Sequence, residues 1–398
     1  MSTATTRTAK TKREPLRFAH PFFTSTPPER RAPIPPFGRR MLDHIQGTLH
    51  AIPKPASDPV MTLADIIGTQ GANDIDNAGT LIFHTVGDTG RGKDSPQETV
   101  AEAMATDFDA AHPEKSPAFL FHLGDVIYGP QKDQAYRTEF YEPYEHYPGK
   151  IIAIPGNHDG ETFPTTDPSS LKAYRANFCA ASAVVPPIAG SIFRQTMTMP
   201  GVYWLLDAPF VDIIGLYSNS AENPGFVSGQ IPGAHQKAFL LAKLNKIATE
   251  RGQGKRKGLI IATHHPPFSS GGHSGSQAML DDIDNACQTA GVMPDVFFAA
   301  HAHNYQRYTR RVTLNGRLMQ IPFVVAGMGG RNNGTVQAAT GQVEGDHTFV
   351  ASRRGFGYAT VEATVGTLTI RSIGVDPDTG AKSNVDQVTV DLATNAIS

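Results

Sequence analysis

The sequence has few cysteines and no long apolar run. Only Cys179 and Cys287 occur among 398 residues. A large secreted protein rarely relies on so few, so we expect no disulfide framework and interpret both as buried small hydrophobic residues. The longest apolar runs, such as 259–262 and 296–300, have the length of buried strands and fall far below the ~18–20 residues that a membrane span needs. The sequence therefore predicts no membrane segment.

The net charge of the whole chain is also small. The 35 Lys and Arg residues nearly balance the 37 Asp and Glu residues. Nine of the basic and three of the acidic residues lie in 1–45, which leaves 26 against 34 in the remainder. Because that remainder is net negative, we expect no nucleic-acid binding.

Residues 1–45 are rich in Thr, Arg and Pro and show no hydrophobic periodicity. This composition favours a basic disordered tail or an arm that lies over the rest of the protein. Neither Arg30-Arg31 nor Arg39-Arg40 is followed by the apolar core of an export signal, so a cytoplasmic location is expected. Residues 46–398 are interpreted as one folded domain, and nothing in the sequence indicates its oligomeric state.

From residue 80 onward, short β-branched and aromatic runs alternate with helical stretches, which is typical of an α/β protein. Strands are expected at 80–86, 117–123, 150–154, 202–206, 210–216, 258–262, 295–299 and 321–326. Helices are expected at 96–112, 132–142, 168–180, 233–251 and 276–290. Beyond about residue 346, the pattern predicts antiparallel hairpins that complete one sheet.

Metal-ligating side chains follow five of these strands. The motifs are GDTG (87–90), GDVIY (124–128), GNHD (156–159), THHPP (263–267) and AHAH (300–303). Asp, Asn and His are good ligands for hard or borderline cations, and a single one after a strand is usually only a turn residue. Five in succession indicate a metal site at the strand ends.

These five motifs, in this order, resemble those of the calcineurin-like metallophosphoesterases. That family usually has Asp-x-His in the first motif, whereas here Gly90 takes the His position and Tyr128 follows Asp125 by three residues. The exchange resembles the purple acid phosphatases, as do HAHNYQR (301–307) and GMGGRN (327–332). The resemblance implies a central two-layer β-sandwich flanked by helices, α/β in class, in the compact form with one catalytic domain.

The resemblance also implies the ligands of a dinuclear centre. Asp88, Tyr128 and His303 would hold one metal, Asn157, His264 and His301 the other, and Asp125 would bridge them. Because a phenol has a pKa of ~10, its ionisation near neutral pH needs a strong Lewis acid. Fe³⁺ fits that demand better than Zn²⁺ or Mg²⁺, so we expect Fe³⁺ beside one divalent metal, Zn²⁺, Mn²⁺ or Fe²⁺.

Such a centre is expected to hydrolyse small phosphate monoesters, with a metal-bound hydroxide attacking phosphorus. His158 and His273 are the candidates for stabilising the phosphoryl oxygens and protonating the leaving group. His264, at the strand end, is favoured over His265 as the ligand, and Asp159 is expected to orient a neighbouring histidine. Tyr305 and Arg307 are either pocket wall or a structural pair.

Besides independent binding of an anionic partner by the basic N-terminal tail, two other functions stay open. One is a divalent-metal phosphodiesterase or nucleotidase of the same superfamily, in which Tyr128 is merely nearby. The other is a non-catalytic scaffold that has kept the fold and lost the chemistry, which the complete ligand set disfavours. Metal analysis with a visible spectrum distinguishes the first alternative from a purple acid phosphatase. A turnover assay with an aryl phosphate distinguishes the second alternative from an enzyme.

Overall fold

A computed structural model describes residues 33–130, 132–162, 170–228 and 234–398. The larger helices are α1 (Pro36–Gly47), α2 (Leu63–Ala78), α3 (Pro96–Ala105), α4 (Lys132–Tyr136), α5 (Asn157–Gly160), α6 (Lys172–Phe178), α7 (His235–Gly252) and α8 (Gln277–Ala290). The strands are β1 (Val60–Thr62), β2 (Thr80–Val86), β3 (Phe119–His122), β4 (Lys150–Ala153), β5 (Trp204–Asp207), β6 (Val211–Gly215), β7 (Gly258–Ala262), β8 (Val296–Ala299), β9 (Tyr305–Leu314), β10 (Arg317–Ala326), β11 (Val343–Glu344), β12 (His347–Arg353), β13 (Phe356–Thr364), β14 (Thr367–Val375) and β15 (Lys382–Asp391).

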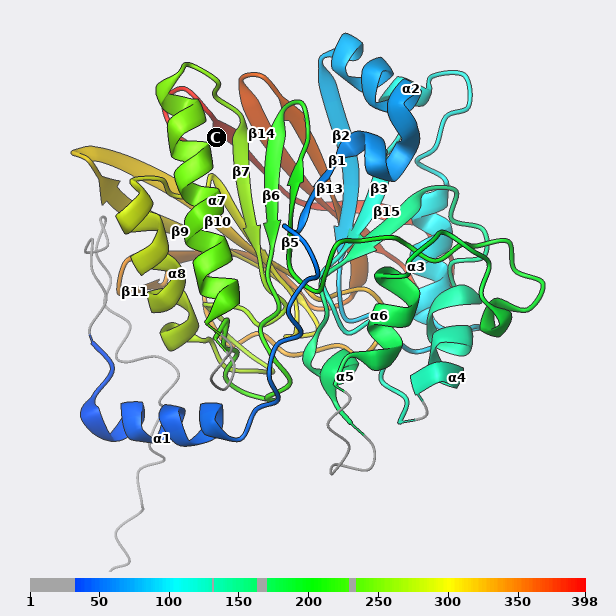
Figure 1. The fold of residues 1–398 in the computed structure, drawn as a ribbon, viewed down its shortest axis with the longest axis horizontal. Helices are drawn as coiled ribbons and strands as arrows, with labels where there is room; N and C mark the ends of the chain where they lie inside the picture. Colours follow the sequence, from blue (N-terminus) through cyan, green and yellow to red (C-terminus); the bar gives the residue numbers. More distant parts are fainter. Residues whose placement is uncertain (1–32, 131, 163–169, 229–233) are drawn as a thin grey trace, which may run out of the picture.

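Two sheets form the centre of the protein. The nine-stranded sheet has the order β1-β5-β6-β7-β8-β10-β9-β12-β11, and the six-stranded sheet the order β15-β14-β13-β2-β3-β4. Helices α7 and α8 cover one side, and α3, α4 and α6 lie on the other (Figure 1). The predicted α/β class and the paired sheets with flanking helices are thus confirmed.

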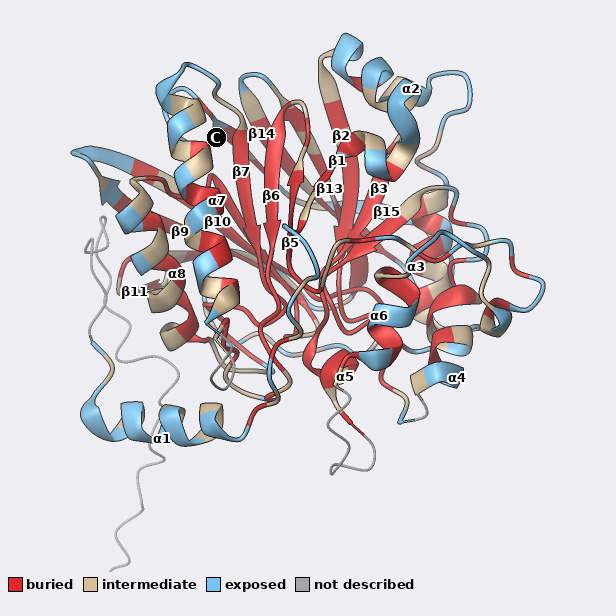
Figure 2. Ribbon diagram, viewed as in Figure 1, coloured by how far each residue is buried: buried red, intermediate tan, exposed pale blue. Residues whose placement is uncertain are grey.

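Parallel pairing explains the apolar strands. β2, β3 and β4 pair in parallel in one sheet, and β6, β7 and β8 do so in the other. Strands covered on both faces read as continuous apolar runs rather than alternating ones, as the wholly buried β7 shows. Figure 2 shows burial along β5, β6 and β7, whereas exposed residues gather on α1 and on the outer surfaces of α2, α7 and α8.

The expected strands between 80 and 326 are all present, although β10 begins earlier, at Arg317. Two helices differ from expectation: α3 ends at Ala105, and the helix expected over 132–142 divides into α4 and a π-helical turn at Arg137–Tyr141. The first residues of two expected helices, 168–169 and 233, lie outside the described residues. The C-terminal strands β13, β14 and β15 complete the six-stranded sheet as predicted, while β11 and β12 join the other sheet.

The described part of the N-terminal segment contains a helix that the sequence did not predict. Residues 1–32 of the expected tail lie outside the described residues, and 36–47 form α1. Partly buried Leu42 and Ile45 pack against the small apolar cluster of Leu49, Ala221 and Phe226. Of the two cysteines, Cys287 is buried as expected, but Cys179 is only half-buried; both are free. In the described part of the chain, no helix is long and apolar enough to cross a membrane.

Candidate metal centre

The five motifs lie at one end of the protein, where strands of the two sheets end. Asp88, Asp125 and Asn157 follow β2, β3 and β4 of one sheet, and His264, His301 and His303 follow β7 and β8 of the other. Helix α5, which begins at Asn157, marks this end in the lower part of Figure 1. Backbone strain concentrates here, because four of these residues have positive φ: Asp88 at 57°, Asp125 at 54°, His301 at 67° and His303 at 51°.

Asp125 lies at the middle of the cluster. Ligand atoms of Asp125, His264 and His301 all lie within 4.8 Å of one another, and the three residues are buried. Oδ1 of Asp125 accepts the backbone N–H of His158 at 2.9 Å. Within the described residues, Oδ2 of Asp125 and Oδ2 of Asp88 are buried without a hydrogen-bond partner. Burying a carboxylate oxygen without a partner is energetically costly, and a bound cation would remove that cost. The two oxygens therefore fit a metal at this place.

His264 turns a lone pair toward these oxygens. Its Nδ1 lies 2.9 Å from the backbone carbonyl of Leu123, which can only accept, so Nδ1 carries the proton. Its Nε2 then faces Oδ2 of Asp125 at 3.3 Å and Oδ1 of Asn157 at 3.2 Å. These three atoms are all hydrogen-bond acceptors, so without a metal a proton on Nε2 is needed to relieve their repulsion. Burial alone would lower the pKa of His264, but the charge of Asp125 raises it to about 9.

His301 reaches the cluster through its other nitrogen. Its Nε2 donates to the backbone carbonyl of Glu222 at 2.8 Å, which leaves Nδ1 as the atom available to a metal. Burial lowers the pKa of His301 well below its usual value, so the neutral ring that a metal needs is favoured.

Tyr128 occupies the opposite side of the cluster. Its hydroxyl lies 3.2 Å from Oδ1 of Asp88 and 3.3 Å from Nε2 of His303. Burial, with the charges of Asp125 and Asp88, raises the pKa of Tyr128 well above 10. Without a strongly charged cation the residue is therefore a neutral phenol. The structure thus brings together all seven predicted ligands, Asp88, Asp125, Tyr128, Asn157, His264, His301 and His303; their binding of metal stays a prediction.

Comparison with known proteins bears on this arrangement. The family model described as calcineurin-like phosphoesterase matches residues 82–305, more than half of the chain. The chain belongs to the calcineurin-like phosphoesterase family. It is 25% identical over 181 residues to purple acid phosphatase 21 of Arabidopsis thaliana, a match that covers 45% of this chain and 36% of that relative. The chain therefore spans little more than a third of the length of this curated relative.

Two solved structures share the fold of this calcineurin-like phosphoesterase. GAP50, the anchor in the inner membrane complex of Plasmodium, aligns with a TM-score of 0.50 over 77% of this chain and 89% of its own. PhoD aligns with a TM-score of 0.50 over 87% of this chain and 73% of its own. Both are 11% identical to this protein, so the likeness concerns the fold alone.

The two predicted outer histidines lie against different predicted ligands of the phosphoesterase centre. The ring of His158 packs 4.5 Å from that of Tyr128, and its Nδ1 lies 3.0 Å from Oε2 of Glu161. The ring of His273 lies 4.0 Å from that of His301 and 5.5 Å from that of His303. The side chains of His158 and His273 are 28% and 22% exposed, so both can meet a substrate from solvent.

His265 has a structural role, which supports His264 as the ligand. It is buried, and its Nδ1 and Nε2 lie 2.8 Å from Ser218 Oγ and 2.7 Å from the Ala221 carbonyl. Burial lowers the pKa of His265 to about 3. Tyr305 and Arg307 are also structural, because both bind the carboxylate of Asp386, at 2.6 Å and 2.5 Å.

The role expected for Asp159 is wrong. Its carboxylate accepts backbone N–H groups of Gly156 at 2.8 Å, Val126 at 3.2 Å and Ile127 at 3.3 Å, rather than a histidine. The side chain therefore ties the Asn157 loop to the Asp125 loop. Three backbone donors satisfy a carboxylate as well as an imidazole does, and the sequence contains no signal for this choice.

Sequence reasoning also missed four neighbours of the centre. The guanidinium of Arg331 lies 4.2 Å above the ring of Tyr128, and Oε2 of Glu139 accepts the Tyr128 backbone N–H at 2.6 Å. Glu222 and Asn223 approach Asn157 and His273 from the loop after β6. Only Arg331 lies in a motif quoted above, GMGGRN; the others lie outside the motifs.

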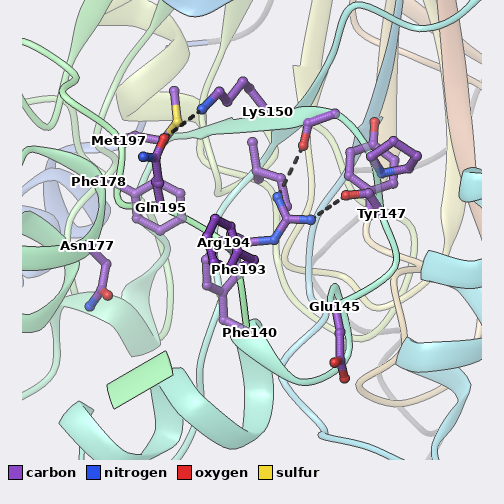
Figure 3. Close-up of a pocket in the computed structure, with 13 residues that line it drawn as sticks. Phe140, Glu145, Tyr147, Lys150, Asn177, Phe178, Phe193, Arg194, Gln195 and Met197 are labelled. Atoms are coloured by element: carbon purple, nitrogen blue, oxygen red, sulfur yellow. Dashed lines mark hydrogen bonds between the residues drawn. The ribbon is translucent and has the colours of Figure 1, made fainter. Parts of the chain in front are cut away.

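A pocket of about 180 Å³ elsewhere in the protein contains none of the predicted ligands (Figure 3). Of its two cationic residues, Lys150 faces Gln195, and Arg194 donates to the backbone carbonyls of Tyr144 at 2.7 Å and Gly149 at 3.1 Å, and also to that of Tyr147. The guanidinium thus closes the turn between α4 and β4. This pocket therefore has a structural explanation that involves no ligand.

Proposed function

We propose that this phosphoesterase hydrolyses small phosphate monoesters as a purple acid phosphatase, with Fe³⁺ and one divalent metal. One observation carries the proposal: the hydroxyl of Tyr128 lies between Asp88 and His303, 3.2 Å and 3.3 Å away. A carboxylate, an imidazole and a phenol around one point form a donor set suited to Fe³⁺. The partial match to the Arabidopsis purple acid phosphatase supports the same subgroup.

Different residues of the chain are suited to different steps of this reaction. When bound, a dinuclear centre supplies Lewis-acid charge to the phosphoryl oxygens and a nucleophile near neutral pH. Asp125 lies where it can serve both metal positions, with Oδ1 held by the His158 backbone and Oδ2 near His264. His158 and His273 flank the centre and are suited to hold the equatorial oxygens and to move a proton to the leaving group.

A metal and substrate survey tests this function. The purified protein is analysed for metals and assayed with an aryl phosphomonoester, a bis-aryl phosphodiester and nucleotides. The proposal predicts one iron and one divalent metal per chain, and faster hydrolysis of the monoester than of the diester. An iron-free enzyme that prefers diesters or nucleotides would favour the divalent-metal alternative. Absence of turnover with both metals bound would favour a scaffold.

A further inference from the structure

Glu222 connects three predicted site residues although it belongs to no recognised motif. It lies in the loop that follows β6, and its backbone carbonyl accepts Nε2–H of His301 at 2.8 Å. The bond selects the tautomer of His301 that keeps the proton on Nε2 and turns the lone pair of Nδ1 toward Asp125. Hydrogen bonds to the far nitrogen of a ligating histidine set its tautomer and orientation in this way.

The side chain of Glu222 also determines which way the Asn157 amide points. Oε2 of Glu222 accepts Nδ2–H of Asn157 at 3.2 Å. With its nitrogen held there, Asn157 places Oδ1 3.2 Å from Nε2 of His264, inside the cluster. Only the amide oxygen can bind a cation, because the nitrogen has no available lone pair. A rotated Asn157 would therefore be lost as a ligand.

The other carboxylate oxygen of Glu222 faces His273. Oε1 lies 3.4 Å from Nδ1 of His273, and Nδ2 of Asn223 lies 3.2 Å from the same nitrogen. Asn223 cannot offer its oxygen there, because Oδ1 already accepts from Ser274 N at 2.9 Å and Ser274 Oγ at 3.0 Å. Nδ1 of neutral His273 thus accepts from Asn223, and the proton is on Nε2.

The carboxylate of Glu222 can accept a proton from His273 when His273 acts as a general acid. The imidazolium carries protons on both nitrogens and gives the one on Nε2 to the leaving group. The remaining proton on Nδ1 then faces the N–H of Asn223, which cannot accept it. Oε1 of Glu222, 3.4 Å from Nδ1 of His273, can accept this proton.

The loop that carries Glu222 is braced from both sides. Gln46 of α1 donates to the carbonyl of Ser228 at 2.6 Å, and buried His265 donates to the carbonyl of Ala221 at 2.7 Å. Phe226 is buried against Leu49, two residues after the end of α1. The Glu222 backbone is therefore placed by packing, while its side chain, 60% exposed, can be changed without opening the core.

We propose that Glu222 is a positioning residue of the phosphoesterase centre: it holds Asn157 with its oxygen toward the metal and accepts the Nδ1 proton of His273. The His273 part rests on the proposed hydrolysis, whereas the Asn157 part requires only that the centre binds metal.

Two substitutions separate these parts. Glu222→Ala removes both contacts, whereas the amide oxygen of Glu222→Gln can still accept from Asn157 but no carboxylate then faces His273. Glu145→Gln, at an exposed position distant from the motifs, is the control. Each purified protein is titrated with a chelator while metal per chain is measured, and hydrolysis is then followed for a series of phosphate monoesters with increasing leaving-group pKa.

We expect Glu222→Ala to bind one of its two metals ~10–100-fold more weakly, the effect typical of lost partners of metal ligands, and Glu222→Gln to retain it. Both variants should show a steeper decline in rate with leaving-group pKa than wild type and Glu145→Gln. Wild-type metal retention in Glu222→Ala, or equal loss in both variants, overturns the Asn157 role. An unchanged slope in Glu222→Gln overturns the His273 role. If wild type binds two metals yet hydrolyses no ester, the proposed function fails while the metal titration still decides the Asn157 role.

Discussion

The ring of Tyr128 fills the space that a side chain at position 90 would need. A β-carbon built on Gly90 lies 2.8 Å from Cδ2 of Tyr128, closer than such atoms approach in real structures. The same β-carbon lies 2.9 Å from the Cα of Ile127 and 2.8 Å from Oε2 of Glu139. The position of Tyr128 therefore leaves no room for a side chain at position 90, such as the histidine expected there from the usual family pattern.

Gly90→Ala tests this packing. The added methyl group displaces Tyr128 or the backbone at Ile127, and overpacking of this kind costs typically ~1–3 kcal/mol in the free energy of unfolding. Urea unfolding of the metal-free protein measures the loss. Gly252→Ala, at the end of α7 with no atom within 4 Å of the new carbon, is the control and should not lower stability. Equal stability of Gly90→Ala and wild type would show that Tyr128 does not block position 90.

Asp125→Asn should abolish turnover and leave the fold intact. The amide oxygen can still accept the His158 backbone N–H, but the charge shared by the two metal positions is lost. We expect activity below a few per cent of wild type with an unchanged circular dichroism spectrum, whereas Asp378→Asn in the exposed turn after β14 keeps full activity. Substantial activity of Asp125→Asn with both metals bound would contradict the bridging role.

His273→Ala should discriminate between substrates. If His273 protonates the leaving group, esters with poor leaving groups lose ~10²–10⁴-fold in rate, while activated aryl esters lose far less. His112→Ala, on an exposed turn, is the control. Equal losses on both kinds of ester would instead assign His273 to phosphate binding, and no loss would show that His273 takes no part in the reaction.

Asp107 should make stability depend on pH in acid. Burial opposes its ionisation, but hydrogen bonds from His84, Lys382 and Tyr358 lower its pKa to about 2. The unfolded value is about 3.9, so the stabilisation is present above pH ~4 and is lost as the pH falls toward 2.

With the carboxylate partly exposed, the contribution is roughly 1–2 kcal/mol. Urea unfolding between pH 5 and 2 should show a smaller decline in Asp107→Asn than in wild type. Parallel declines would assign the acid sensitivity to other carboxylates.

Much of the fold and the clustering of the seven predicted ligands could be inferred from sequence, because each lies in a segment that follows a short apolar strand. Other parts lacked such a signal. Helix α2 contains Gly68 at φ 83°, a break that interrupts helical periodicity, and β9 begins immediately after the HAHN segment with Arg and Thr among its residues. Glu222 contacts Asn157, His301 and His273, and Asp159 accepts from Val126, Ile127 and Gly156. Most of these partners are distant in sequence, so no local pattern encodes the contacts.

The visible spectrum of the purified, oxidised protein, recorded with its metal content, tests whether Tyr128 binds Fe³⁺. A phenolate bound to Fe³⁺ absorbs visible light by charge transfer, so the protein should be violet to pink and hold about one iron and one divalent metal per chain. Tyr128→Phe should bleach the colour, whereas Tyr203→Phe, whose hydroxyl lies 3.0 Å from His235 Nδ1, should keep it. A colourless, iron-free wild type that hydrolyses phosphate esters equally well with Mn²⁺ or Zn²⁺ would contradict the account.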